Sequence, residues 1–396
     1  MRRSSAKLGK FARRKKQRAV GQLRLTLDNS ASAPKLDVRG PMEQLMGTAD
    51  PRPVRNFSYR PLGAFRLFLA LLVVFQHYAL WVYGFAPPIE TGNIAVLVFF
   101  FLSGFVITEA ADLIYAGRPA AFLMNRFLRI VPLFLIAILM SCAVLYGANQ
   151  FVNLTDEAGR LAIDPFAIKN LIANLWSIIP APGRLSLQPS FPMLRIAWAL
   201  RVELAFYVCV ALLLFIGVII RGLPFRLLFG TVALVLLALD VWYQILKPEW
   251  NPLIGSVPFF CAGAALYFLV SGSKANALLF ALGFVLAVTA VWTQMPIGGV
   301  AVFVTLIAGC ALLAVKVRKN ASLDRLLGDL SYPVYVGHWL PLLAFANVVG
   351  LMSPQLCLPA QILTTVVALA LPVAYFALID RAVRRLREFV RGVSIR

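Results

Sequence analysis

Charged residues are scarce in this sequence, and acidic ones are the scarcest. Only 14% of the 396 residues are charged, and 17 Asp and Glu stand against 38 Lys and Arg. Soluble proteins have about 25% charged and about 45–50% apolar residues, whereas 60% of this chain is hydrophobic. The composition therefore excludes an ordinary soluble domain and favours a protein that lies in lipid.

Cysteine is also rare, and its spacing is uninformative. The five cysteines are Cys142, Cys209, Cys261, Cys310 and Cys357, four of them inside apolar runs. Because none of them forms a Cys-x-x-Cys pair or a cluster with histidine, we predict neither a disulfide framework nor a metal site. Packing as small apolar side chains is the simpler interpretation.

The basic residues are concentrated at the two ends of the chain. Residues 1–58 are polar, basic and poor in aromatic side chains, so we expect a disordered cytosolic tail that contacts anionic lipid. An apolar stretch begins only near residue 61, which argues against a cleaved signal peptide. No folded recognition element accompanies the tail, so nucleic acid is not an expected partner. Residues 382–396 are interpreted as a second basic cytosolic tail.

Between the tails, long apolar stretches follow one another, each near the roughly 20 residues that a helix needs to cross a bilayer. We therefore predict an all-α, polytopic integral membrane protein with about ten transmembrane helices. The expected spans are 63–83, 93–114, 130–148, 196–220, 225–246, 253–271, 276–293, 297–315, 332–350 and 359–380.

The loops between these spans predict the orientation. With the N-terminus inside, the inner loops hold ten Lys and Arg and the outer loops hold five, four of them in the long segment 149–195. This distribution follows the positive-inside rule and places both termini in the cytosol. Within the long outer segment, residues 168–179 have an amphipathic pattern, which is typical of a helix on the membrane surface.

Two histidines, His77 and His338, are the only ones in the chain, and both fall inside apolar spans. An ionisable group within a membrane is costly and is a candidate for function. His77 follows Arg66 by eleven positions, which on a helix places the two side chains within about 20° of each other and about 16 Å apart along the axis. This spacing suits a substrate with an anionic head bound by arginine and a reactive end that meets histidine.

Five motifs in order resemble the acyltransferase-3 family of integral-membrane acyltransferases. The first is the Arg66 and His77 pair of the first helix. The others are the Phe-Phe-x-Leu-Ser-Gly-Phe pattern within residues 99–107, Arg-x-x-Arg-Ile-x-Pro at 126–132, Trp-x-Leu-x-x-Glu-x-x-Phe-Tyr at 198–207, and Gly-x-x-Ser-Tyr-x-x-Tyr-x-x-His at 328–338. The resemblance covers residues 59–381, which we take as the membrane acyltransferase domain. Ala95, Ala199 and Arg201 depart from common family residues, which bears on the acceptor.

The resemblance implies transfer of an acyl group, most often acetyl, from cytosolic acyl-coenzyme A to a hydroxyl of a cell-surface polysaccharide or related glycan. The protein would then be an O-acetyltransferase of the bacterial inner membrane, with acyl-coenzyme A as a substrate and no permanently bound cofactor or metal. The sequence leaves open a small-molecule acceptor, a transient acyl-histidine and a homodimer.

Six residues are the candidate site. His77 is the expected general base, and Glu203 would orient His77 or the acceptor hydroxyl. Arg66, Arg126 and Arg129 would hold coenzyme A phosphates, and Ser103 would lie beside the donor's narrow arm. His338 receives a supporting role.

Other interpretations of the same residues stay open. Glu203 could form a structural salt bridge, Arg126 and Arg129 could anchor the helix by the positive-inside rule, and the Ser-Gly pair at 103–104 could serve helix packing. A transporter or flippase with a buried His and Glu proton relay is the main alternative function, and a non-catalytic scaffold is another.

Overall fold

The computed structural model describes residues 60, 62–151, 164–181, 187–220, 223–247, 250–273, 276–316, 322–348, 354–375 and 381–391. Every regular element among them is an α-helix, which confirms the predicted all-α class. All these helices belong to one unit, Pro51–Arg396. The predicted tail, residues 1–58, lies outside the described residues.

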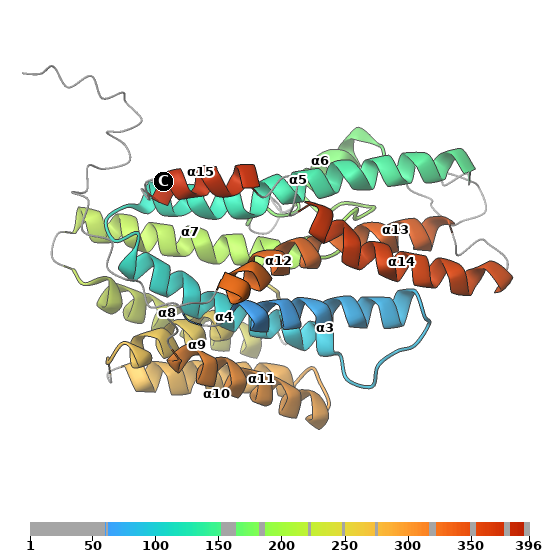
Figure 1. The fold of residues 1–396 in the computed structure, drawn as a ribbon. Coiled ribbons are helices and arrows are strands. Elements are labelled where there is room, and N and C mark those ends of the chain that lie inside the picture. Colours follow the sequence, from blue (N-terminus) through green and yellow to red (C-terminus); the bar gives the residue numbers. More distant parts are fainter. Residues whose placement is uncertain are drawn as a thin grey trace, which may run out of the picture. The chain divides into compact units, whose positions relative to one another are not determined.

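Seven of the described helices are long and apolar enough to cross a membrane, and they run roughly side by side (Figure 1). They are α3 (Gly63–Trp81), α4 (Thr91–Leu113), α5 (Pro119–Phe151), α7 (Ala197–Ile219), α8 (Phe225–Leu246), α11 (Ile297–Val315) and α14 (Pro354–Tyr375). Two shorter apolar helices, α9 (Val257–Val270) and α10 (Ala277–Trp292), match two further expected spans. A polytopic membrane protein is therefore confirmed.

The span expected at 332–350 differs from the prediction because it is broken at His338. The structure has α12 (Ser322–Gly337) before this residue and α13 (Trp339–Val348) after it. Pro341 explains the break, since it lacks an N–H for the carbonyl four residues earlier and its ring crowds that carbonyl. The chain thus presents His338 at a junction of two helices rather than inside one.

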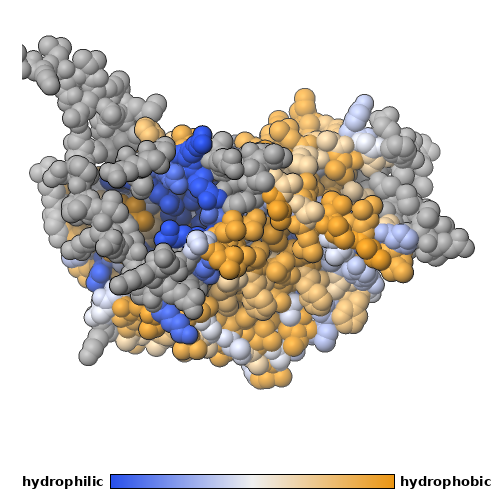
Figure 2. Space-filling view, viewed as in Figure 1, coloured by the Kyte–Doolittle hydropathy of each residue, from blue (hydrophilic) through white to orange (hydrophobic). Residues whose placement is uncertain are grey.

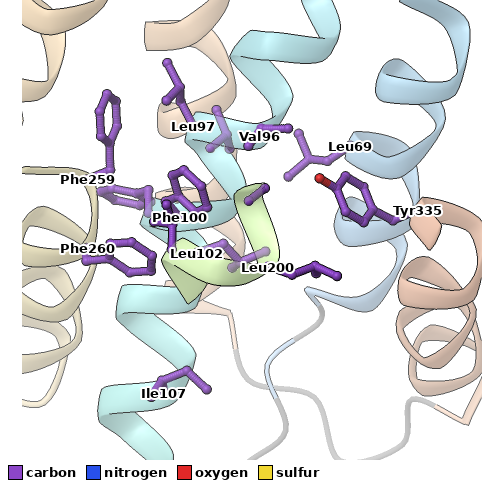
Figure 3. Packing of buried hydrophobic residues seen from close by; sticks show 14 of the residues in the cluster. Leu69, Val96, Leu97, Phe100, Leu102, Ile107, Leu200, Phe259, Phe260 and Tyr335 are labelled. Carbon is purple, nitrogen blue, oxygen red and sulfur yellow. The ribbon is translucent and has the colours of Figure 1, made fainter. Parts of the chain in front are cut away.

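The centre of the bundle is α4, which packs against α3, α7, α9 and α11. Gly104 on α4 and Gly263 on α9 allow these two helices to approach each other closely, because a Cβ at either glycine would overlap the backbone of the other helix. Figure 3 shows Phe100 of α4 against Phe259 and Phe260 of α9, with Tyr335 of α12 approaching α4 from the opposite side. Gly104 therefore has a packing role and directs α4 toward α9.

The beginning of α3 is held by the beginning of α12. The Asp324 carboxylate accepts hydrogen bonds from the backbone N–H groups of Gly63 and Ala64, each at 2.8 Å. A carboxylate at this position satisfies two of the helix's free N–H groups and interacts favourably with its positive end. This cap fixes Arg66, one turn further along α3, beside α12.

Two described helices lie outside the apolar bundle. The amphipathic segment contains α6 (Ile168–Trp176), which confirms a helix there. Asn170 and Asn174 of α6 accept hydrogen bonds from the N–H groups of Phe191 and Met193, at 2.9 and 2.8 Å, and so hold the segment that enters α7. The second is α15 (Arg381–Arg391), which runs along the first half of α5 (Figure 1).

Polar and apolar surfaces separate clearly. Figure 2 shows hydrophilic residues gathered at the end of the molecule that holds α15 and the start of α5, next to a wide apolar surface. We expect this hydrophilic end to face the cytosol, because it carries the arginines of α15 and of the loop before α5.

Reporter fusions would test this orientation. Fusions after residues 90 and 355 should report the outer side, and fusions after residues 320 and 396 should report the cytosol, because the loops rich in Lys and Arg stay inside. A C-terminal reporter found outside would show an odd number of crossings and would contradict the predicted placement of both termini.

Candidate active site

A pocket of about 700 Å³, counted out to its open mouth, lies between α3, α4, α5, α7 and α12. It brings together four of the six predicted site residues: Arg66, Ser103, Arg129 and Glu203. The other polar side chains in its lining are Tyr207, Ser331, Tyr332 and Tyr335, and the rest of the lining is apolar. The pocket therefore combines two cations, one carboxylate and several hydroxyls within an apolar wall.

Glu203 is held by hydroxyl groups. Ser103 Oγ donates a hydrogen bond to Glu203 Oε1 at 3.3 Å, and the Tyr207 hydroxyl donates to the same oxygen. In the described part of the chain Glu203 forms no ion pair within 4.0 Å, so the structural salt bridge considered from the sequence is not found there. The carboxylate is thus fixed in the pocket wall, and one of its oxygens receives both hydrogen bonds.

His77 contacts the second histidine. Its Nδ1 lies 2.9 Å from Nε2 of His338, and the two rings are nearly parallel, with 11° between their planes. The edge of the Trp339 ring meets His77 with centroids 5.6 Å apart. His338 is fully buried, and the Tyr78 hydroxyl donates to its backbone carbonyl at 3.0 Å. The partner of His77 is therefore His338, and no hydrogen bond of the described residues joins His77 to Glu203.

The hydrogen bonds of this pair determine which nitrogen carries each proton. Nδ1 of His338 lies 3.2 Å from the carbonyl oxygen of Val334, which can only accept, so this nitrogen carries a hydrogen. In the neutral ring Nε2 of His338 is then an acceptor, and Nδ1 of His77 must donate to it. The remaining nitrogen of His77, Nε2, keeps its lone pair. This is the form that a general base requires.

The histidine pair adjoins the pocket through α12 and does not itself line it. Tyr335 belongs to the pocket lining, and its ring contacts His338 with centroids 6.3 Å apart. Arg66 meets α12 in the pocket, whereas His77 meets the residue that directly follows α12. Both predicted residues of α3 thus lie against the same segment of the chain.

Arg126 lies behind the pocket. It is only 4% exposed, and its guanidinium lies over the rings of Tyr115, Phe122 and Tyr207 at 5.6 to 6.0 Å from their centroids. Arg126 therefore does not line this pocket, and its expected contact with coenzyme A stays a prediction. Residues three apart on a helix differ by about 60° in direction, so Arg129 reaches the pocket while Arg126 supports Tyr207.

The tyrosines Tyr207, Tyr332 and Tyr335 are the pocket residues that the sequence interpretation left without a role. Tyr332 also donates a hydrogen bond from its hydroxyl to the carbonyl of Ile130 at 2.8 Å, which joins α12 to α5. The sequence carries a signal for two of these tyrosines, because aromatic rings recur at intervals of three residues at Tyr332, Tyr335 and His338. That interval places side chains on one side of a helix.

The fold and this site define a polytopic helical membrane protein with a polar pocket and a pair of histidines beside it. Residues 62–378 match the family model Acyl_transf_3, described as an acyltransferase domain, and the chain belongs to this family of acyltransferases. The resemblance identified from the motifs is thereby confirmed.

The chain is also similar to a curated protein over part of its length. The chain is 33% identical over 149 residues to Protein 2 in picA locus of Rhizobium radiobacter, an alignment that covers 36% of this chain and 75% of that protein. No solved structure matches this chain.

Proposed function

We propose that this protein transfers an acyl group, typically acetyl, from cytosolic acyl-coenzyme A to a hydroxyl of a cell-surface polysaccharide or related glycan at the inner membrane of a bacterium. The observation that carries the proposal is the histidine pair, because its hydrogen bonds leave a lone pair on His77 Nε2 and because the pair adjoins, through Tyr335, a pocket lined by two arginines. Membership of an acyltransferase family supports the reaction class.

The proposed reaction uses the pocket residues in distinct ways. The acceptor oxygen forms a bond with the thioester carbonyl carbon, the carbon–sulfur bond breaks, and His77 Nε2 takes the hydroxyl proton and passes it to the departing thiolate. In a variant of this route the acyl group is first carried by His77 and then passed to the acceptor. Arg66 and Arg129 would attract the donor's phosphates. Glu203 would orient the acceptor by accepting a hydrogen bond from a neighbouring hydroxyl, because the single hydrogen of the reacting hydroxyl goes to His77.

The direct test is acceptor-dependent release of thiol. Purified full-length protein in lipid nanodiscs, given acetyl-coenzyme A and a bacterial surface polysaccharide, should release free coenzyme A, and mass spectrometry should find the acetyl group on the glycan. A transporter or flippase would release no thiol, since it breaks no thioester bond. Absence of thiol release with every glycan tested would contradict the glycan acceptor, and absence with small hydroxyl acceptors as well would contradict the reaction.

A further inference from the structure

The last described helix, α15, is fastened to α5 by its own backbone. The Arg118 guanidinium donates to the carbonyls of Val390 and Arg391, each at 3.2 Å, and Asn125 Nδ2 donates to the carbonyl of Arg387 at 3.1 Å. These bonds satisfy carbonyls of the last turns of α15 and place a cation at its negative end. Val390 is buried, so α15 packs against the rest of the molecule.

A second pocket lies where α15 meets α5, α12 and α14. Its polar lining consists of Arg129 from α5, Asp329 and Tyr332 from α12, Tyr375 from α14 and Arg387 from α15. Arg129 and Tyr332 also line the first pocket. These two side chains therefore lie between the two pockets. A ligand in the first pocket and a ligand in the second pocket would lie on opposite sides of Arg129.

Positive charge in the second pocket exceeds negative charge. Asp329 is the only carboxylate in its lining, and Arg384 already pairs with it at 3.4 Å. Arg387 has a buried Nε without a hydrogen-bond partner among the described residues. Burial and, next, the positive charge of Arg129 lower the pKa of the Arg387 guanidinium to about 9. A largely buried guanidinium nitrogen without an acceptor is costly, and an anion bound between Arg129 and Arg387 would offset this cost.

We propose that this second pocket binds a phosphate group, held by Arg129 from α5 and Arg387 from α15. The planar guanidinium group donates paired hydrogen bonds that match phosphate oxygens, and two of them from different helices fix the position of one anion. With the proposed function as its basis, the phosphate belongs to the nucleotide end of acyl-coenzyme A, whose acyl arm then passes Arg129 and Tyr332 into the first pocket. A phospholipid headgroup offers the same chemistry.

Binding of coenzyme A tests whether the phosphate group in the second pocket comes from the donor. The full-length protein would be placed in nanodiscs of uncharged phosphatidylcholine, and its affinity for coenzyme A measured by calorimetry. Arg387→Gln should weaken binding about ten-fold, the loss expected for one charge-assisted contact, and Arg387→Lys should weaken it less because the charge remains. The matched control is Arg385→Gln, which removes the same charge from an exposed position of the same helix and should leave affinity unchanged.

Binding of phosphatidylglycerol tests whether the phosphate group in the second pocket comes from a phospholipid headgroup. If the headgroup is the ligand, adding this lipid to the nanodiscs should raise the melting temperature of the wild type and of Arg385→Gln but not of Arg387→Gln, while coenzyme A affinity stays the same in all three. Equal behaviour of Arg387→Gln and Arg385→Gln in both measurements would overturn the site. Because neither measurement needs turnover, a protein that binds coenzyme A through Arg387 but transfers no acyl group would contradict the proposed function and leave the phosphate site standing.

Discussion

Replacing His77 with alanine is expected to lower acyl transfer by about 10²–10⁴-fold, the usual loss on removal of a general base. The reason is the free lone pair on His77 Nε2, which the hydrogen bond from Nδ1 to His338 leaves available. Loss of transition-state interaction lowers kcat, whereas donor binding in the first pocket should persist, since His77 does not line it. The measurement is kcat and donor KM at equal membrane abundance.

A matched control separates chemistry from packing at this position. His77→Gln keeps a polar side chain of similar length that can still donate to His338, but its amide is no base at neutral pH. It should therefore be as inactive as His77→Ala while melting close to the wild-type temperature. A well-inserted glutamine variant with near wild-type turnover would remove His77 from the chemistry. A rapid first-turnover burst in the wild type would favour the route through an acyl-histidine.

The helices were predictable from the sequence because a helix must have about 20 apolar residues to cross the bilayer, and stretches of that length can be recognised directly. Each expected apolar span except 332–350, which is divided between α12 and α13, corresponds to one described helix, and the spans at 225–246 and 297–315 have the predicted bounds. Two other features depend on particular residues and contacts that a hydropathy average does not record. The helix α5 begins eleven residues before the expected residue 130, because the polar stretch with Asn125 and Arg126 is covered by α15 and by aromatic rings. The break at His338 depends on Pro341, a single residue inside a stretch that is mostly apolar.

The candidate site was predictable to the extent that its residues belong to motifs. Arg66, Ser103, Arg129 and Glu203 were chosen from separate helices, and the structure brings them into one pocket. Spacing along one helix could not show which of Arg126 and Arg129 enters it, since that depends on the rotation of α5 against α7. It also could not pair His77 with His338, because the two are 261 positions apart and meet only through the packing of α3 on α12.

His338 should act on the reaction through His77. Replacing it with leucine keeps the volume of the ring but removes the acceptor for His77 Nδ1, so the His77 ring is free to place its hydrogen on Nε2, where no base remains. We expect His338→Leu to lower kcat by about 10²-fold, within the range typical of disabling a general base, with donor KM little changed. His338→Gln offers an amide oxygen near the position of Nε2 and should restore most of the lost rate.

The control for this prediction is Tyr78→Phe, which deletes the hydroxyl that donates to the His338 backbone carbonyl and leaves both imidazole rings in place. If His338 merely stabilises the junction between α12 and α13, Tyr78→Phe and His338→Leu should both lower the melting temperature, and glutamine should restore no more activity than leucine. If His338 fixes the His77 tautomer, leucine and glutamine should melt alike yet differ in kcat. Equal kcat for these two His338 variants would therefore contradict the tautomer argument, even with His77 retained as the base.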